Sequence, residues 1–149
     1  MRKVLPAILV IALVAVAAAC GGSEKKTQKL SRGDYVASMN RLCASANDQV
    51  AALRLTTAIG TWKRNGQKAA QIAKATVVGF KFYTPPDELR SLASEYISAS
   101  EEIAAAVQDA ADAAKAGNVT KFDDAISRQQ NAGQKGNALA GRIGAKSCA

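Results

Sequence analysis

Apolar and polar residues follow a helical pattern from residue 31 to the end of the chain. Apolar positions recur at intervals of three and four, which places them on one face of a helix because an α-helix has about 3.6 residues per turn. No stretch of useful length alternates as a strand would, and the chain contains no internal repeat. The pattern therefore predicts an all-α domain over residues 31–149.

The first predicted helix begins at residues 31–34 (Ser-Arg-Gly-Asp), which resemble a capping box with an acid three places after the serine. We expect this helix to end between residues 57 and 61, where Gly60 suits a helix stop. Cys43 lies at the inner edge of its apolar face. That face consists of Tyr35, Met39, Leu42, Ala46, Val50 and Leu53.

The second predicted helix follows a short connection that contains Trp62 and the pair Asn65-Gly66. It ends around Tyr83, because the residue before Pro85 is sterically excluded from the helical region. Its apolar face consists of Ala69, Ile72, Ala73, Val77 and Phe80.

The third predicted helix has the clearest periodicity. Pro86 suits a first helical turn, and the acidic residues Asp87 and Glu88 suit the positive end of the helix dipole. Gly117 suits a helix stop. The apolar positions repeat as in a helix bundle, and they are Leu89, Leu92, Tyr96, Ala99, Ile103, Ala106 and Ala110.

The fourth predicted helix begins near Asn118 or Thr120. Glycine inside a helix costs about 1 kcal/mol relative to alanine, so Gly133, Gly136 and Gly141 predict a close approach of a neighbouring helix. A ligand groove along this surface of small residues is the alternative. The inner face consists of Phe122, Ile126, Gln129, Gly133, Gly136, Ala140 and Ile143.

Short connections between the helices predict an up-down-up-down four-helix bundle. In that topology the start of the first helix and the end of the fourth lie at the same end. Cys43 lies about three turns into the first helix, roughly 15–20 Å along it. The tail after Ile143 would have to fold back to reach it, and the few residues that follow can span that distance.

The N-terminus has a different composition. Arg2 and Lys3 precede an uncharged apolar run over residues 4–19, which ends in three alanines before Cys20. A membrane-spanning helix needs about 20 apolar residues, whereas a positive start, a shorter apolar run and small residues at its end are typical of a signal peptide. We therefore expect residues 1–19 to be cleaved off, with ordinary secretion or an uncleaved anchor helix as the alternatives.

A cysteine directly after the small residues of a signal peptide resembles the lipobox of bacterial lipoproteins. Ala17 departs from that pattern, because the lipobox usually has leucine or a similar aliphatic residue there. The resemblance implies that the Cys20 thiol carries a diacylglyceryl group and that this lipid anchors the chain to the membrane. Residues 20–30 then form a lipidated flexible tether, of which ten residues reach about 35 Å at most.

The number of cysteines agrees with such an anchor. The chain has three cysteines, Cys20, Cys43 and Cys148. An odd number of cysteines in an exported protein leaves one without a disulfide partner. If Cys20 carries lipid, Cys43 and Cys148 can pair as a disulfide in an oxidising compartment. Two buried free thiols are the alternative.

Charge and composition narrow the classes of function. A net charge of +8 would suggest nucleic acid in a cytosolic protein, but export and the scattered basic residues argue against that partner. The chain has no histidine, which removes Ser-His-Asp and Cys-His nucleophile systems and imidazole metal ligands. The adjacent carboxylates Glu101-Glu102 and Asp123-Asp124 do not face each other on a helix. We therefore predict no catalytic, cofactor-binding or metal-binding residues, and no enzyme.

Several segments together resemble small lipoproteins of unknown function from high-GC Gram-positive bacteria. They are the lipobox, residues 35–47 (YVASMNRLCASAN), residues 84–89 (TPPDEL), the alanine-rich helix that ends at Gly117, and Cys148 near the C-terminus. The resemblance covers residues 35–148. It implies a helical extracytoplasmic domain at the cell membrane and brings no activity with it.

The leading hypothesis is a lipid-anchored helical domain of the cell envelope that acts through contacts with an unknown envelope protein. The alternative is a carrier or sensor that binds a small apolar ligand between its helices. A large internal pocket would favour the carrier, and a tight core with an exposed apolar stripe would favour the interaction module. Phe82 and Tyr83 are expected in the core, with a patch facing the membrane or a partner as the alternative.

Overall fold

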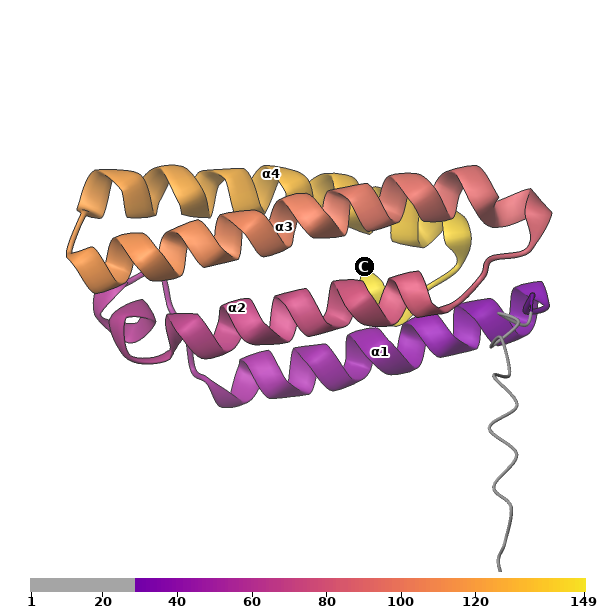
Figure 1. Ribbon diagram of the computed structural model, residues 1–149, viewed down its shortest axis with the longest axis horizontal. Coiled ribbons are helices and arrows are strands. Elements are labelled where there is room, and N and C mark those ends of the chain that lie inside the picture. The colour runs from indigo at the N-terminus through magenta and orange to yellow at the C-terminus, as the bar shows by residue number, and fades with distance from the viewer. Residues whose placement is uncertain (1–28) are drawn as a thin grey trace, which may run out of the picture.

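The computed structural model describes residues 29–149, which form an all-α bundle (Figure 1). The predicted signal peptide, Cys20 and all but the last two residues of the predicted tether lie outside the described residues. The predicted four-helix architecture is confirmed. The helices are α1 (Arg32–Ala52), α2 (Ile59–Phe82), α3 (Arg90–Ala116) and α4 (Val119–Ile143), with 3₁₀ turns η1 (Asp87–Leu89) and η2 (Lys146–Cys148).

Each helix runs antiparallel to its neighbour in sequence (Figure 1). The most extensive contacts join α3 to α4 and α3 to α2. By contrast, α1 packs on α2 and on the C-terminal turn η2 rather than along α4. The edge between α1 and α4 is therefore not closed by direct helix packing.

The helix boundaries predicted at Ser31, before Pro85 and at Gly117 are confirmed. The hydroxyl of Ser31 accepts a hydrogen bond of 3.2 Å from the N–H of Asp34, which caps α1. The helix α2 ends at Phe82, just before the two prolines. Gly117 ends α3 in the left-handed conformation, with φ of 71°, and the Asn118 side chain then caps α4.

The expected end of the first helix is wrong, because α1 stops at Ala52 rather than between residues 57 and 61. The polar side chains that follow satisfy backbone groups in place of further helix. Thr61 donates its hydroxyl hydrogen to the carbonyl of Ala58 over 2.8 Å, and Asn65 donates to the carbonyl of Leu53 over 2.9 Å.

The expected connection around Trp62 is also wrong, because Trp62 and the pair Asn65-Gly66 lie inside α2. The Trp62 indole N–H donates to the carbonyl of Thr56 over 2.9 Å. Its ring packs edge-on against Phe122 of α4, with centroids 5.8 Å apart. This residue therefore holds the start of α2 against the far helix instead of marking a turn.

Buried side chains form two separate cores. The first core lies near the start of α1 and contains Tyr35, Met39, Cys43, Phe80, Leu89, Ala93, Tyr96, Ala99, Leu139, Ala140, Ile143 and Ala145. The second core contains Trp62, Ala69, Ala70, Val107, Ala110, Ala113, Ala114, Phe122 and Ala125. Phe80 lies in the first core and Trp62 in the second. The expectation that Phe82 lies in the core is wrong, because its side chain is 66% exposed.

The expected close packing at the glycines of the fourth helix is wrong. A Cβ added at Gly133 or Gly141 would meet nothing within 4 Å, and one at Gly136 would make only an ordinary contact of 3.7 Å with Ile103. The helices approach closely elsewhere. A Cβ at Gly66 of α2 would lie 3.0 Å from the Cβ of Ala111 in α3.

Candidate functional site: an uncharged groove between α1 and α4

The open edge of the bundle leads into a groove of about 710 Å³. Its floor is formed by α2 and α3, and its two walls are the second half of α1 and the first half of α4. This volume is within the range of small-molecule sites. The groove is not on the glycine-rich stretch of α4, because α4 contributes Ile126, Gln129 and Gln130 to it.

The sequence accounts for this groove through the small side chains on α1. Ala46 and Ala51 line the wall, and Val50 is 39% exposed although it belongs to the predicted apolar face. On α4, Ile126 and Gln129 occupy predicted core positions but face the groove. These positions lack a covering helix, and so their apolar surface remains accessible.

The lining is mostly apolar, with neutral polar side chains among the apolar ones. Aliphatic floor residues are Ile72, Val77, Ile103 and Val107. Polar residues of the lining are Asn47, Thr56, Thr57, Thr76, Ser100, Gln129 and Gln130. Among residues 29–149, none that lines the groove is acidic or basic. A charged ligand would have no counter-charge here, whereas an uncharged apolar one would find matched surface.

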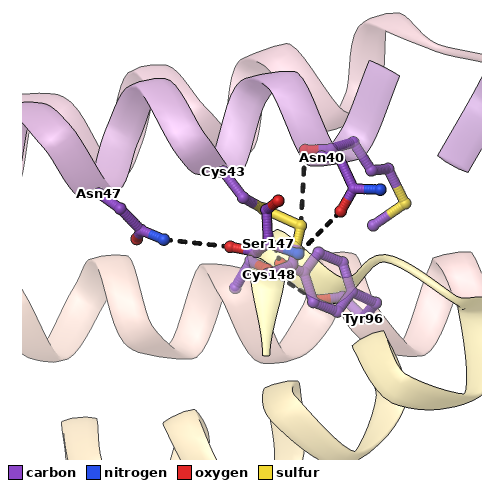
Figure 2. The surroundings of a disulfide bond; sticks show 8 residues. Asn40, Cys43, Asn47, Tyr96, Ser147 and Cys148 are labelled. Atoms are coloured by element: carbon purple, nitrogen blue, oxygen red, sulfur yellow. Dashed lines mark hydrogen bonds between the residues drawn. A yellow bond between two sulfur atoms is a disulfide. The ribbon is translucent and has the colours of Figure 1, made fainter. Parts of the chain in front are cut away.

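A disulfide between Cys43 and Cys148 closes one end of the groove (Figure 2). The two Cα atoms are 5.1 Å apart and 105 positions apart in sequence. These are the two cysteines that remain when Cys20 is set aside. The tail reaches Cys43 because Gly144, with φ of 96°, ends α4 in a left-handed turn that favours glycine.

Two asparagines of α1 hold the same tail from either side of the disulfide (Figure 2). The N–H of Ser147 donates to Oδ1 of Asn40 over 2.8 Å. Nδ2 of Asn47 donates to the carbonyl of Ser147 over 3.0 Å. Asn40, Cys43 and Asn47 are spaced by three and four residues, so all three lie on one face of α1. Sequence reasoning missed this clamp, although that spacing was visible.

Tyr96 lies at the junction of the groove and the disulfide (Figure 2). Its hydroxyl is 3.6 Å from Sγ of Cys43, and the hydroxyl must be the donor because a disulfide sulfur carries no proton. Burial raises the pKa of Tyr96 to about 12. Tyr35, deeper in the same core, also has its pKa raised by burial. Its hydroxyl has no hydrogen-bond partner in the part of the chain that the structure describes.

The remaining carboxylate pairs lie at the surface of the bundle. Glu101 forms an ion pair with Lys81 over 2.5 Å, and Glu102 pairs with Lys135 over 3.5 Å. Asp123 and Asp124 are exposed at the start of α4. Within residues 29–149, no three side chains of the metal-ligating types come together.

Comparison of the chain with models of known families, with curated proteins and with solved structures finds no match in any of the three. None of the helices between residues 29 and 149 is both long enough and apolar enough to cross a bilayer.

Proposed function

We propose that the protein is a lipid-anchored domain of the cell envelope that carries or senses an uncharged apolar molecule. The observation that supports this function is the 710 Å³ groove between α1 and α4. A mostly apolar lining with a few neutral polar side chains suits a ligand that is mostly hydrocarbon with a few neutral polar groups. The proposal assigns the protein no reaction and no cofactor.

The sequence alone placed contacts with an envelope protein ahead of a carrier. The groove favours the carrier, because a large pocket between the helices supports ligand binding even though this one is open on one side. A protein partner remains the second candidate, since the groove is open and an amphipathic helix could lay its apolar face there. The two candidates differ in the size of the occupant, which makes them separable by experiment.

The proposed location rests on the N-terminal sequence. Residues 1–19 fit a lipoprotein signal peptide and Cys20 fits the acceptor of the lipid. The fold would then lie outside the cytoplasm, attached to the outer face of the cell membrane. An oxidising compartment there would preserve a bond between Cys43 and Cys148.

A fluorescence titration tests the groove. Trp62 is the only tryptophan and lines the groove, so its emission should change when neutral apolar probes such as a fatty alcohol bind. Val50→Arg places a charge at the wall and should weaken binding by about tenfold or more. Val119→Arg is the matched control, because Val119 is exposed and does not line the groove. Equal binding by both variants would count against the groove as the site.

Recovery of the native protein from membranes tests the partner. A stoichiometric small molecule extracted from the purified protein supports the carrier. A stoichiometric protein with no small molecule supports the interaction module instead. The anchor is tested separately with Cys20→Ser, which should release the protein into the medium or leave it unprocessed. Normal processing with full membrane retention would argue against lipidation.

A further inference from the structure

The helix α2 carries the largest net positive charge of the four helices. Every charged residue of this helix is basic, and these residues are Lys63, Arg64, Lys68, Lys74 and Lys81. Lys74 donates to Gln108 and Lys81 pairs with Glu101, both on α3. Lys63, Arg64 and Lys68 are exposed and form no ion pair within residues 29–149.

Two large apolar side chains continue the same face toward the end of α2. Val78 is 68% exposed and Phe82 is 66% exposed, and no other large apolar side chain among residues 29–149 is more exposed. Arg64, Gln71, Val78 and Phe82 are separated by seven, seven and four positions, so they share one side of the helix. Basic residues beside exposed apolar ones are typical of helices that bind membrane surfaces.

The chain enters the fold at the apolar end of this face. The N–H of Leu30 donates to the carbonyl of Thr84 over 3.3 Å, and Lys29 pairs with Asp87. Thr84 is two residues after Phe82. The residues from Cys20 to this point could extend about 35 Å at most, so a lipid on Cys20 would keep Phe82 close to the bilayer.

We propose that the outward face of α2, from Lys63 to Phe82, docks on anionic phospholipid headgroups, with Phe82 inserted among them. The three unpaired basic residues supply the charge complementarity, and the exposed valine and phenylalanine supply apolar area. The groove is lined by other sides of α2, through residues such as Ile72 and Val77. Docking would therefore lay the bundle on the membrane and leave the groove open.

The docking surface rests on the proposed location at the cell envelope, but its test does not need the lipid on Cys20. Both cores are built from residues 35–145, so a chain that begins at residue 20 with Cys20→Ser keeps the whole fold. Its co-sedimentation is measured with vesicles of phosphatidylcholine alone and with an equal mixture of phosphatidylcholine and phosphatidylglycerol. We expect binding about a hundredfold tighter to the anionic vesicles, and weakening as salt rises from about 0.05 to about 0.5 M.

Charge-reversing substitutions test whether the outward face of α2 is the surface that binds the vesicles. Lys63→Glu, Arg64→Glu and Lys68→Glu together should reduce anionic binding by about a hundredfold or more. The control variant combines Lys115→Glu, Lys121→Glu and Arg142→Glu, at exposed residues of α3 and α4. It changes the net charge by the same amount as the α2 variant, and its affinity for anionic vesicles should fall by less than about tenfold. Phe82→Ser leaves the net charge unchanged. It should lower the affinity for vesicles by about tenfold, and by the same factor in high salt.

Three results would overturn the docking surface. They are equal losses in the two triple variants, no preference for anionic vesicles, and a change from dimer to monomer in the α2 variants, which would show that a second copy covers this face. None of these results bears on ligand binding in the groove or on processing at Cys20. The failure of this inference is therefore distinguishable from the failure of the proposed function.

Discussion

The N–H of Ser147 donates a hydrogen bond of 2.8 Å to Oδ1 of Asn40, across 107 positions of sequence. This bond holds the C-terminal turn on α1 next to the disulfide. The open edge of the bundle thus has a covalent link and a polar clamp at one end and no direct helix packing along the rest. The C-terminal turn thus links α1 to α4 at one end of the groove that lies between these two helices.

The clamp should be visible in amide exchange at the C-terminus. Asn40→Ala removes the acceptor of the Ser147 N–H, and a hydrogen bond of this kind contributes about 0.5–1.5 kcal/mol. We expect the Ser147 amide to exchange about two- to tenfold faster by NMR. Asn137→Ala, at an exposed site on α4, is the control and should leave that amide unchanged. Unchanged exchange in Asn40→Ala would mean that this bond is not formed in solution.

Loss of the disulfide should cost much of the stability of the fold. The bond closes a loop with a sequence separation of 105, for which the chain-entropy account gives about 4–5 kcal/mol. Cys43→Ala with Cys148→Ala should lower the free energy of unfolding by about that amount in guanidinium titrations. A reductant should destabilise the parent chain to the same degree and have no effect on the double variant. Two alkylatable thiols in protein from its native host would contradict the bond.

Glycines of α2 and α4 should respond to alanine with opposite signs. Gly66→Ala places a Cβ 3.0 Å from Ala111, and such overpacking destabilises by about 1–3 kcal/mol. Gly133→Ala meets nothing within 4 Å and should stabilise by about 0.5–1 kcal/mol, because alanine is the better helix former. Thermal melts of the two variants measure the difference. Equal shifts in the melting temperature would show that α2 and α3 are less closely packed than described.

The sequence predicted the helices and their stops well, because caps, prolines and glycines act locally. Ser31 and Gly117 mark ends that depend on a few neighbouring residues. The turn after α1 was missed, because the apolar spacing continues through Leu53 while tertiary partners such as Trp62 decide where the helix stops. Periodicity identifies an apolar face but not what covers it.

The groove could not be predicted from the sequence, because periodicity does not show what covers an apolar face. Val50 and Ile126 were assigned to core faces, and each does face inward, but the fold places a groove between them. Likewise, Gly133 suggested a close contact that lies instead at Gly66. Whether a fourth helix closes a bundle depends on side-chain volumes summed over several helices, which no single helical pattern contains.

Stability should fall between about pH 10 and pH 12 because of Tyr96. Its pKa is about 12 in the fold, against a value of 10.0 for the free side chain, since burial disfavours the phenolate. Below about pH 10 the Tyr96 hydroxyl is protonated in both the folded and the unfolded chain, so it adds no pH dependence to the free energy of unfolding. Above about pH 10 the unfolded chain loses the proton first, so the free energy of unfolding declines by about 2–3 kcal/mol up to pH 12.

Tyr96→Phe isolates this contribution. The variant should be less stable at neutral pH, because it loses the hydrogen bond to Cys43, but its stability should decline less between about pH 10 and pH 12. Tyr83→Phe, a partly exposed neighbour of the first core, serves as the control. Guanidinium titrations at several pH values measure both. A decline of the same slope in Tyr96→Phe and in the parent would mean that Tyr96 ionises as readily in the fold as in the unfolded chain.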